Sequence, residues 1–271
     1  MLVDLVSIFR EAPLARMAFN ITSVEGFQVL TEIGETYKVP LILQISERYL
    51  KDLGPSFIRD TVVPRLDHSP NPFVLHLDHA GSLEAIVAGI RLGFTSVMYD
   101  GSTLEMPLNI LRTSEVVRIA RIAGVSVEAE IGHVGGAEDG DEDVEALLTS
   151  VAEARMFVAE ASVDALAVAV GNAHGLYTKM PKIQVDRVAD IYREIQVPLV
   201  LHGGTGIPME DLIRAAQAGV KKINIGTELK QAWIAGAREG VQQFKELDQI
   251  RASIKERIQN AVLGFREIMQ I

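Results

Sequence analysis

The stretch PFVLHLDHA, residues 72–80, begins as an apolar run and ends in titratable side chains. Its apolar residues predict a buried strand, on which alternate side chains share a face. His76 and Asp78 are therefore expected to point the same way and Leu77 the opposite way, with His79 where the strand stops. Polar groups at the end of a buried strand cost free energy unless they are hydrogen-bonded or bind something. A metal ion with an acid beside it would use them.

Working outward, seven more apolar runs resemble strands, and longer amphipathic segments separate them, which is typical of βα units. The eight expected strands are residues 16–19, 40–44, 72–77, 95–98, 125–131, 165–170, 198–201 and 222–225. Helices are expected at residues 82–92, 114–123, 151–161, 184–194 and 209–219. Gly93, Gly124 and Gly219 each lie between an expected helix and the next strand, where a left-handed helix cap is common.

Polar residues follow the expected strands at their carboxyl ends. They are Asn20, Gln44 with Ser46, Asp78 with His79, Asp100, Glu130, Asn172 with His174, His202, and Asn224 with Thr227. In a closed barrel these ends form one ring around one mouth, whereas in a doubly wound open sheet they would lie along an edge. The pattern favours an α/β fold of the (β/α)8 TIM-barrel type, as a single domain over residues 1–271. Residues 228–244 and 247–268 predict two further helices, the last of which would pack on the barrel or on a neighbouring subunit.

Composition excludes several classes of function. The chain has 271 residues, 36 acidic against 26 basic, and no cysteine. The net charge of −10 disfavours nucleic acid and anionic membranes as partners. Without thiols, a metal must be held by histidine and carboxylate. The absence of cysteine also fits a cytoplasmic protein. Residues 1–16 predict a short amphipathic helix rather than a signal peptide, and no window resembles a membrane span.

Three histidines follow strand ends on the third, sixth and seventh units, namely His79, His174 and His202. Imidazoles that converge from separate strands describe an open metal site, and zinc suits these ligands best. Glu130 and Asp100 could hold those ligands in place or act as alternative ligands. Asp78 could act as a general acid or base. His68 and His133 have no such support and are expected in loops or on the surface.

Glycine-rich segments provide the rest of the expected site. Residues 132–143, GHVGGAEDGDED, predict a mobile loop over the mouth, from which Glu138 could reach a bound substrate as a base. The ends of strands seven and eight, residues 202–206 and 224–227, have the small residues with which barrels bind phosphate. A lysine Schiff base is the alternative route to carbon–carbon cleavage, but Lys221 and Lys222 are expected at the wrong end of strand eight.

Several blocks of the sequence resemble the class II, metal-dependent fructose-bisphosphate and tagatose-bisphosphate aldolases. The blocks are AFN (18–20), PLILQIS (40–46), LHLDHA (75–80), TSVMYDGS (95–102), VEAEIGHVGGAEDG (127–140), AVGNAHGLYTKMPKI (169–183), VPLVLHGGTGI (197–207) and KINIGTELK (222–230). One difference lies in the C-terminal segment, where family members commonly carry an arginine for a second phosphate. There, residues 246–254 lack the usual proline, and Arg251 is a loose candidate.

The resemblance implies a role for each matching residue. His79, His174 and His202 would hold zinc, with Glu130 and Asp100 at a second or alternative metal position. Asp78 would protonate the aldehyde-derived oxygen, and Glu138 would exchange a proton with the ene-diolate. The substrate would be held by Asn20, Ser46, Gly175, Gly203, Gly204, Thr205, Asn224, Ile225, Gly226 and Thr227. A monovalent cation near the phosphate and a homodimer or homotetramer would also fit the family.

The expected function is a zinc-dependent aldolase that reversibly cleaves a ketose phosphate, such as fructose or tagatose 1,6-bisphosphate. The products would be dihydroxyacetone phosphate and an aldehyde such as glyceraldehyde 3-phosphate. Three alternatives stay open at this point. They are a class II aldolase for a different sugar phosphate or a sugar acid, a barrel metallohydrolase, and a non-catalytic sugar-phosphate sensor.

Overall fold

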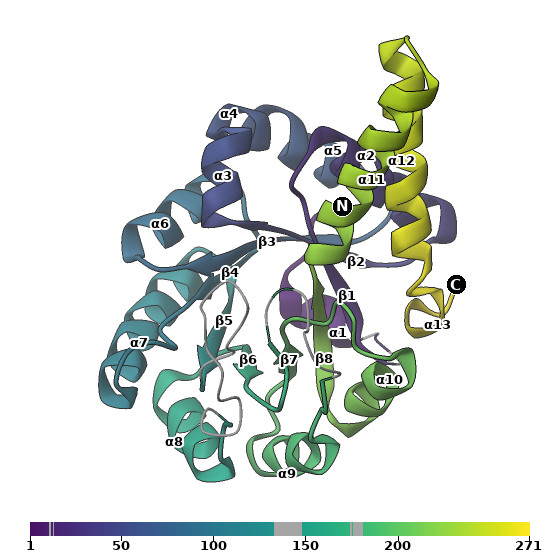
Figure 1. Ribbon diagram of the computed structural model, residues 1–271. Coiled ribbons are helices and arrows are strands. Elements are labelled where there is room, and N and C mark those ends of the chain that lie inside the picture. The colour runs from purple at the N-terminus through teal and green to yellow at the C-terminus, as the bar shows by residue number, and fades with distance from the viewer. Residues whose placement is uncertain (11, 13, 133–147, 174, 176–180) are drawn as a thin grey trace.

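The computed structural model spans residues 1–271 and describes all of them except 11, 13, 133–147, 174 and 176–180. Eight parallel strands close into a barrel in sequence order, with β1 hydrogen-bonded to both β2 and β8 (Figure 1). The strands are β1 Arg16–Asn20, β2 Leu41–Ser46, β3 Phe73–Ala80, β4 Ser96–Tyr99, β5 Ser126–Ile131, β6 Ala165–Val168, β7 Leu199–Leu201 and β8 Val220–Ile225. The predicted barrel is confirmed, and the open sheet is excluded.

Helices surround the barrel and connect consecutive strands. They are α1 Leu5–Arg10, α2 Val24–Tyr37, α3 Glu47–Leu53, α4 Pro55–Phe57, α5 Val63–Asp67, α6 Leu83–Leu92, α7 Met106–Ile122, α8 Val151–Ala161, α9 Val185–Ile195, α10 Met209–Ala218, α11 Thr227–Gln243, α12 Leu247–Leu263 and α13 Arg266–Met269, with a π-helical turn, η1, at Ile58–Val62. The helix expected at 114–123 begins earlier, at Met106. Pro107 is tolerated there because the first turn of a helix does not need its missing N–H.

The amino-terminal helix closes the bottom of the barrel. Leu5, Ile8 and Phe9 of α1 are buried in a cluster with residues of the barrel interior, namely Ala18, Ile42, Val74, Ala165, Ala167 and Val200. The backbone N–H of Leu5 also donates to Ser126 Oγ at 2.9 Å. The short helix predicted here from the sequence is confirmed. Its apolar face covers the end of the barrel opposite the mouth and excludes water from it.

The carboxyl-terminal helices pack within the same chain. α12 lies against α11 and α2, and in Figure 1 the α11–α12 pair projects beyond the ring of strands. Gly236 lets the two helices approach closely, because a Cβ there would lie 2.6 Å from Ile254 Cα. The single helix expected over 247–268 is divided, since α12 ends at Leu263 and α13 begins at Arg266.

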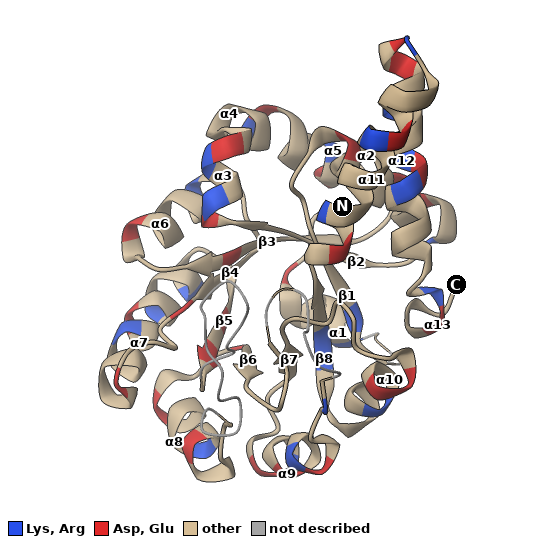
Figure 2. Ribbon diagram, viewed as in Figure 1, with Lys and Arg blue, Asp and Glu red and all other residues tan. Residues whose placement is uncertain are grey.

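None of the helices in the described residues has both the length and the apolar character needed to cross a membrane. Acidic and basic residues are interspersed along the outer helices in the view of Figure 2.

Candidate metal centre and active site

The end of β3 turns two consecutive side chains toward the mouth. The strand was expected to stop before His79, but it continues to Ala80, and its pairing with β4 shifts register between Leu77 and Ala80. His79 has a positive φ of 48°, a conformation that non-glycine residues seldom adopt. On a regular strand Asp78 and His79 would face opposite sides. The irregularity instead brings both to one site, which is a known use of β-bulges.

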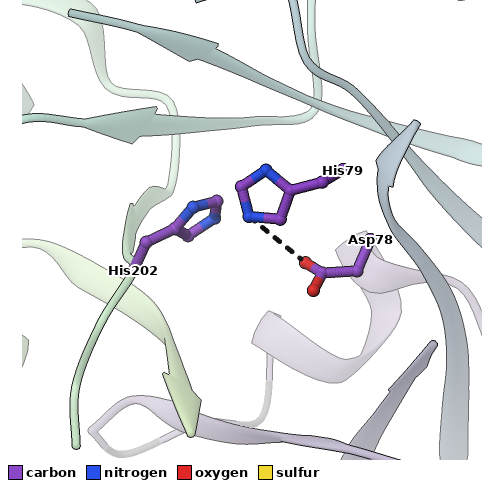
Figure 3. A group of neighbouring side chains, drawn as sticks. All are labelled: Asp78, His79 and His202. Carbon is purple, nitrogen blue, oxygen red and sulfur yellow. Dashed lines mark ion pairs between the residues drawn. The ribbon is translucent and has the colours of Figure 1, made fainter. Parts of the chain in front are cut away.

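Two histidines meet at this site. The ring centroids of His79 and His202 are 4.8 Å apart, and His79 Nε2 lies 4.0 Å from Asp78 Oδ1 (Figure 3). One ligand atom from each of Asp78, His79 and His202 lies within 4.8 Å of the other two. The same holds for His79, Asp100 and Glu130. His79 thus belongs to two overlapping groups that could share a cation.

Carboxylates orient both imidazoles. Asp100 Oδ2 lies 2.6 Å from His79 Nδ1, and Asp100 Oδ1 accepts hydrogen bonds from the backbone N–H and hydroxyl of Ser102. His202 is fully buried, with Nε2 3.0 Å from Glu128 Oε1 and Nδ1 3.1 Å from Glu130 Oε2. Such contacts fix the ring orientation of a metal-binding histidine.

Asp78 is held by three side-chain amides. Its Oδ2 accepts from Asn20 at 3.0 Å and from Gln44 at 3.3 Å, and its Oδ1 accepts from Asn224 at 3.5 Å. Burial opposes ionisation, but the neighbouring His79 and Lys222 outweigh it and lower the pKa of Asp78. The residue is therefore a carboxylate at neutral pH.

An ion pair inside the barrel was not expected from the sequence. Lys222 Nζ lies 2.8 Å from Glu128 Oε2, and neither side chain is exposed to solvent. His76 Nε2 is 3.6 Å from the same oxygen, and its Nδ1 is 2.8 Å from Ser96 Oγ. Burial and the charge of Lys222 lower the pKa of His76 to about 3, so this imidazole is neutral. Lys222, which was expected at the wrong end of strand eight for a Schiff base, is the third residue of β8, and its amine is paired with Glu128.

Small residues line the part of the mouth that follows β6, β7 and β8. Gly203 and Gly175 have positive φ values of 63° and 89°, which favour glycine. A Cβ on Gly226 would lie 2.7 Å from Asn20 Oδ1, so the close approach of β8 to β1 needs glycine. The cavity at the mouth is lined by Asn20, Thr22, Gln44, Ser46, Arg48, Tyr49, Asp78, His79, Gly175, Gly203, Thr205, Asn224, Gly226, Thr227 and Lys230.

Comparison with known proteins decides the family. The family described as "Fructose-bisphosphate aldolase class-II" matches residues 2–270. The chain belongs to the class II fructose-bisphosphate aldolases. It is thus a class II aldolase, a lyase of a metal-dependent family.

Individual relatives agree with this family. A sulfofructosephosphate aldolase from Alkalicoccus urumqiensis is 34% identical over 227 residues, which are 83% of this chain and 79% of the relative. The crystal structure of the YdjI aldolase from Escherichia coli K12 has a TM-score of 0.89 at 28% identity and covers 99% of this chain and 97% of its own. The fructose-bisphosphate aldolase from Campylobacter jejuni shares the fold, with a TM-score of 0.81 at 21% identity over 99% of this chain and 95% of its own.

The residues present in this class II aldolase fit a divalent cation. Histidine and carboxylate are ligands that suit zinc, and the crowded carboxylates need compensating positive charge. Burial lowers the pKa of His79, but Asp78 and Asp100 outweigh it and raise that pKa to about 10. Burial also lowers the pKa of His202. The hydrogen bonds with Glu128 and Glu130 outweigh burial, so that this pKa is raised. Without a metal ion to balance the carboxylates, the imidazoles of His79 and His202 therefore tend to be protonated.

The structure assembles some of the expected site residues and does not describe others. The structure brings together two of the three expected histidine ligands, His79 and His202, with the carboxylates of Asp78, Asp100 and Glu130. The described residues do not include His133, Glu138, most of the 132–143 loop or His174. Gly204 is buried and is not among the residues that line the cavity. Ile225 points into the apolar core outside the barrel, so only its backbone could face a ligand.

Other expectations concerned positions away from the mouth. Arg251, the loose candidate for a second phosphate, lies on α12, where its Nε is 3.1 Å from Glu25 Oε1. It does not line the mouth. His68 is exposed at the end of α5, as expected.

Sequence reasoning missed Glu128, Arg48 and Lys230, and it named Lys222 without its buried pairing. For Glu128 the signal was present, because period-two alternation places it on the same face of β5 as Glu130.

Proposed function

We propose that this class II aldolase is zinc-dependent and cleaves a ketose phosphate into dihydroxyacetone phosphate and an aldehyde. The observation that carries the proposal is the meeting of His79, His202 and Asp78 at the mouth, within reach of Asp100 and Glu130. His79, His202 and His174 would hold the metal, with Glu130 and Asp100 as alternative ligands. Zinc bound there would act as a Lewis acid that stabilises negative charge on a substrate oxygen.

Asp78 would move the proton on the aldehyde side. In cleavage its carboxylate accepts the proton of the substrate hydroxyl beside the bond that breaks, and in condensation it returns that proton to the aldehyde-derived oxygen. The lowered pKa of Asp78 keeps it ionised before the reaction, and the amides of Asn20, Gln44 and Asn224 hold the carboxylate in place. Glu138 would exchange the proton on the dihydroxyacetone phosphate side.

The phosphate of that half would lie against Gly175, Gly203, Gly204, Thr205 and the segment from Asn224 to Thr227. These residues lie at the end of β8 or after β6, β7 and β8, and the first turn of α11 begins at Thr227. Backbone N–H groups and a helix N-terminus favour an anion, and the family-implied monovalent cation would lie nearby. Asn20 and Ser46 would contact the remainder of the substrate.

The identity of the sugar is a second question. Fructose or tagatose 1,6-bisphosphate fits the family, while the relative from Alkalicoccus urumqiensis is named for a sulfofructose phosphate. We propose a ketose 1-phosphate whose other end varies among these compounds. A cytoplasmic homodimer or homotetramer, each chain a single domain over residues 1–271, completes the proposal.

Replacing a ligand tests the function. His79→Ala should lose bound zinc and at least about 1000-fold of the cleavage activity, because the metal stabilises the charge that develops in the reaction. His68→Ala, which removes an exposed imidazole outside the mouth, should keep both. Zinc content by atomic emission and release of dihydroxyacetone phosphate are the measurements. A His79→Ala protein with full zinc and full activity would refute the ligand assignment.

A further inference from the structure

A buried side-chain amide from an outer helix reaches the end of β5. Asn109 lies on α7, is 2% exposed, and donates from Nδ2 to the backbone carbonyl of Glu130 at 3.0 Å. The pairing of β4 with β5 ends at Tyr99 and Ala129, one residue before Glu130. The Asn109 amide therefore supplies a hydrogen bond to the Glu130 backbone beyond the point where the neighbouring strand has ended.

The same amide lies against the segment that follows β4. A Cβ added to Gly101 would lie 2.3 Å from Asn109 Oδ1, so the backbone of Gly101 is close to this amide. Gly101 directly follows Asp100, whose Oδ2 lies 2.6 Å from His79 Nδ1. One side chain of α7 thus adjoins the backbone beside two carboxylates of the mouth, Asp100 and Glu130.

A buried hydroxyl fixes the orientation of that amide. Thr113 lies one turn further along α7, is fully buried, and donates from Oγ1 to Asn109 Oδ1 at 3.0 Å. Because the amide oxygen is bonded to Thr113, the amide nitrogen is directed toward Glu130. Buried polar groups are costly unless they are hydrogen-bonded, and both side chains meet this condition. The helix therefore presents one defined donor to the end of β5.

These contacts adjoin one of the two candidate metal groups. The ligand atoms of His79, Asp100 and Glu130 lie within 4.8 Å of one another. Asp100 and Glu130 come from adjacent strands but lie beyond the last pair of the β4–β5 ladder. Two carboxylates this close repel each other, so their spacing needs a backbone that is held from outside the ladder.

We infer that Asn109 is a positioning residue, which keeps Asp100 and Glu130 at the spacing from which they and His79 can hold a divalent cation. This inference rests on the proposed metal-dependent function. Asn109 acts through the backbone of the candidate ligands, and Thr113 acts through Asn109. Loss of contacts that support metal ligands in this way typically lowers metal affinity by roughly 10- to 100-fold.

The test measures zinc affinity by competition with a chromophoric chelator. Asn109→Leu, which is similar in size but has no polar atom, should raise the zinc Kd by roughly 10- to 100-fold. Thr113→Val keeps the shape of threonine without the hydroxyl and should raise the Kd by a smaller factor. Thr113→Ser keeps the hydroxyl and should stay close to the natural value. With cobalt in place of zinc, the visible absorption bands report the arrangement of the ligands and should shift in the first two variants only.

Asn71→Leu is the matched control. Asn71 is also buried and donates from Nδ2 to a backbone carbonyl, that of Val39 at 2.9 Å. It precedes β3 and therefore lies at the end of the barrel opposite the mouth. Like Asn109→Leu, this variant should have a lower urea midpoint, because a buried carbonyl loses its donor. Unlike Asn109→Leu, it should keep the natural zinc Kd and cobalt spectrum.

Three results would overturn the inference. The first is an Asn109→Leu protein with the natural zinc Kd and cobalt spectrum. The second is an equal loss of zinc affinity in Asn71→Leu, which would mean that lower stability alone weakens binding. The third, which decides the matter if Asn109→Leu does not fold, is the same zinc Kd in Thr113→Val and Thr113→Ser.

Solvent exchange of the C–H protons of dihydroxyacetone phosphate separates this inference from the proposed function. Exchange in the natural protein, together with an unchanged zinc Kd in Asn109→Leu and Thr113→Val, would overturn the positioning role and leave the aldolase proposal standing. Weaker zinc binding in these variants of a protein that shows no exchange would support the positioning role and overturn the proposed reaction.

Discussion

At the scale of single residues, the most consequential contact is the buried ion pair between Glu128 and Lys222. The paired Glu128 also accepts from His202, so the same carboxylate neutralises the lysine and orients the imidazole. Burial opposes the charged form of Glu128, but the charge of Lys222 and the hydrogen bond with His202 outweigh it and hold the pKa of Glu128 well below the usual range. A single charge thus supports both the barrel interior and the candidate metal centre.

Replacing one partner of this pair should be more harmful than replacing both. Glu128→Gln leaves the Lys222 charge buried without a counter-charge and should cost about 3–5 kcal/mol of unfolding free energy. Adding Lys222→Met should recover most of that loss. Urea unfolding of the metal-free proteins measures both values. A Glu128→Gln protein within ~1 kcal/mol of the natural sequence would contradict this account of the interior.

Residue patterns explain how much of the site could be predicted. Alternation along β3 correctly places His76 and Asp78 on one face, and the polar strand ends correctly indicate one mouth. His79 joins them through a local backbone irregularity with φ of 48°, which spacing does not reveal. Lys222 was expected only at the wrong end of strand eight for a Schiff base, and its buried partner, Glu128, is 94 residues away in sequence, so spacing could not reveal the pair. Contacts of this kind depend on the closed fold.

At the scale of elements, the α11–α12 pair depends on close backbone approach. Gly236→Ala places a methyl group 2.6 Å from Ile254 Cα and 2.8 Å from Ser253 O, so the helices must separate. The expected cost is about 1–3 kcal/mol, as for other overpacked interfaces. Thermal unfolding by circular dichroism should show a lower Tm.

Gly26→Ala is the control for this change. Gly26 also lies in a helix, but its added Cβ would meet only Ser23 Oγ at 3.4 Å. Alanine favours helix over glycine, so this variant should be neutral or slightly more stable. Equal destabilisation by the two substitutions would show that helix–helix contact is not the cause.

A second contact between elements should depend on pH. Glu35 of α2 and Arg65 of α5 form two hydrogen bonds of 2.7 Å, and Arg65, together with Ser69, overcomes burial to lower the pKa of Glu35 to about 2 from 4.5. Because the folded pKa is the lower one, the stabilisation is fully present above pH 4.5 and is lost as the pH falls toward 2. Partial exposure of the pair reduces its value to about 1 kcal/mol.

The variant Glu35→Gln measures this contribution. Its difference from the natural sequence in urea midpoint should be largest at pH 7 and should shrink by pH 3.5, because the unfolded chain, with the ordinary pKa of 4.5, takes up a proton there while folded Glu35 stays ionised. A difference that stays constant over this range would mean that the carboxylate charge is not responsible.

At the scale of the whole molecule, the barrel divides its interior by depth. Apolar residues and α1 fill the amino end, the pair of Glu128 and Lys222 lies in the middle, and the mouth collects the histidines and carboxylates. The polar mouth is costly for folding, and the apolar end and outer helices compensate for it. The order of layers explains why candidate ligands at the ends of β3, β4, β5 and β7 lie close together in two overlapping groups at the mouth.

The central claim is that this mouth, loaded with a divalent metal, removes a proton beside the carbonyl of dihydroxyacetone phosphate. Deuterium uptake by that compound in D2O, followed by proton NMR, tests the claim without any knowledge of the aldehyde. With zinc bound, one of the two protons on the carbon that bears the hydroxyl should exchange, and removal of zinc by a chelator should stop the exchange until zinc is restored. Exchange at an equal rate in the zinc-free protein, or none in the zinc-loaded protein, would contradict the account.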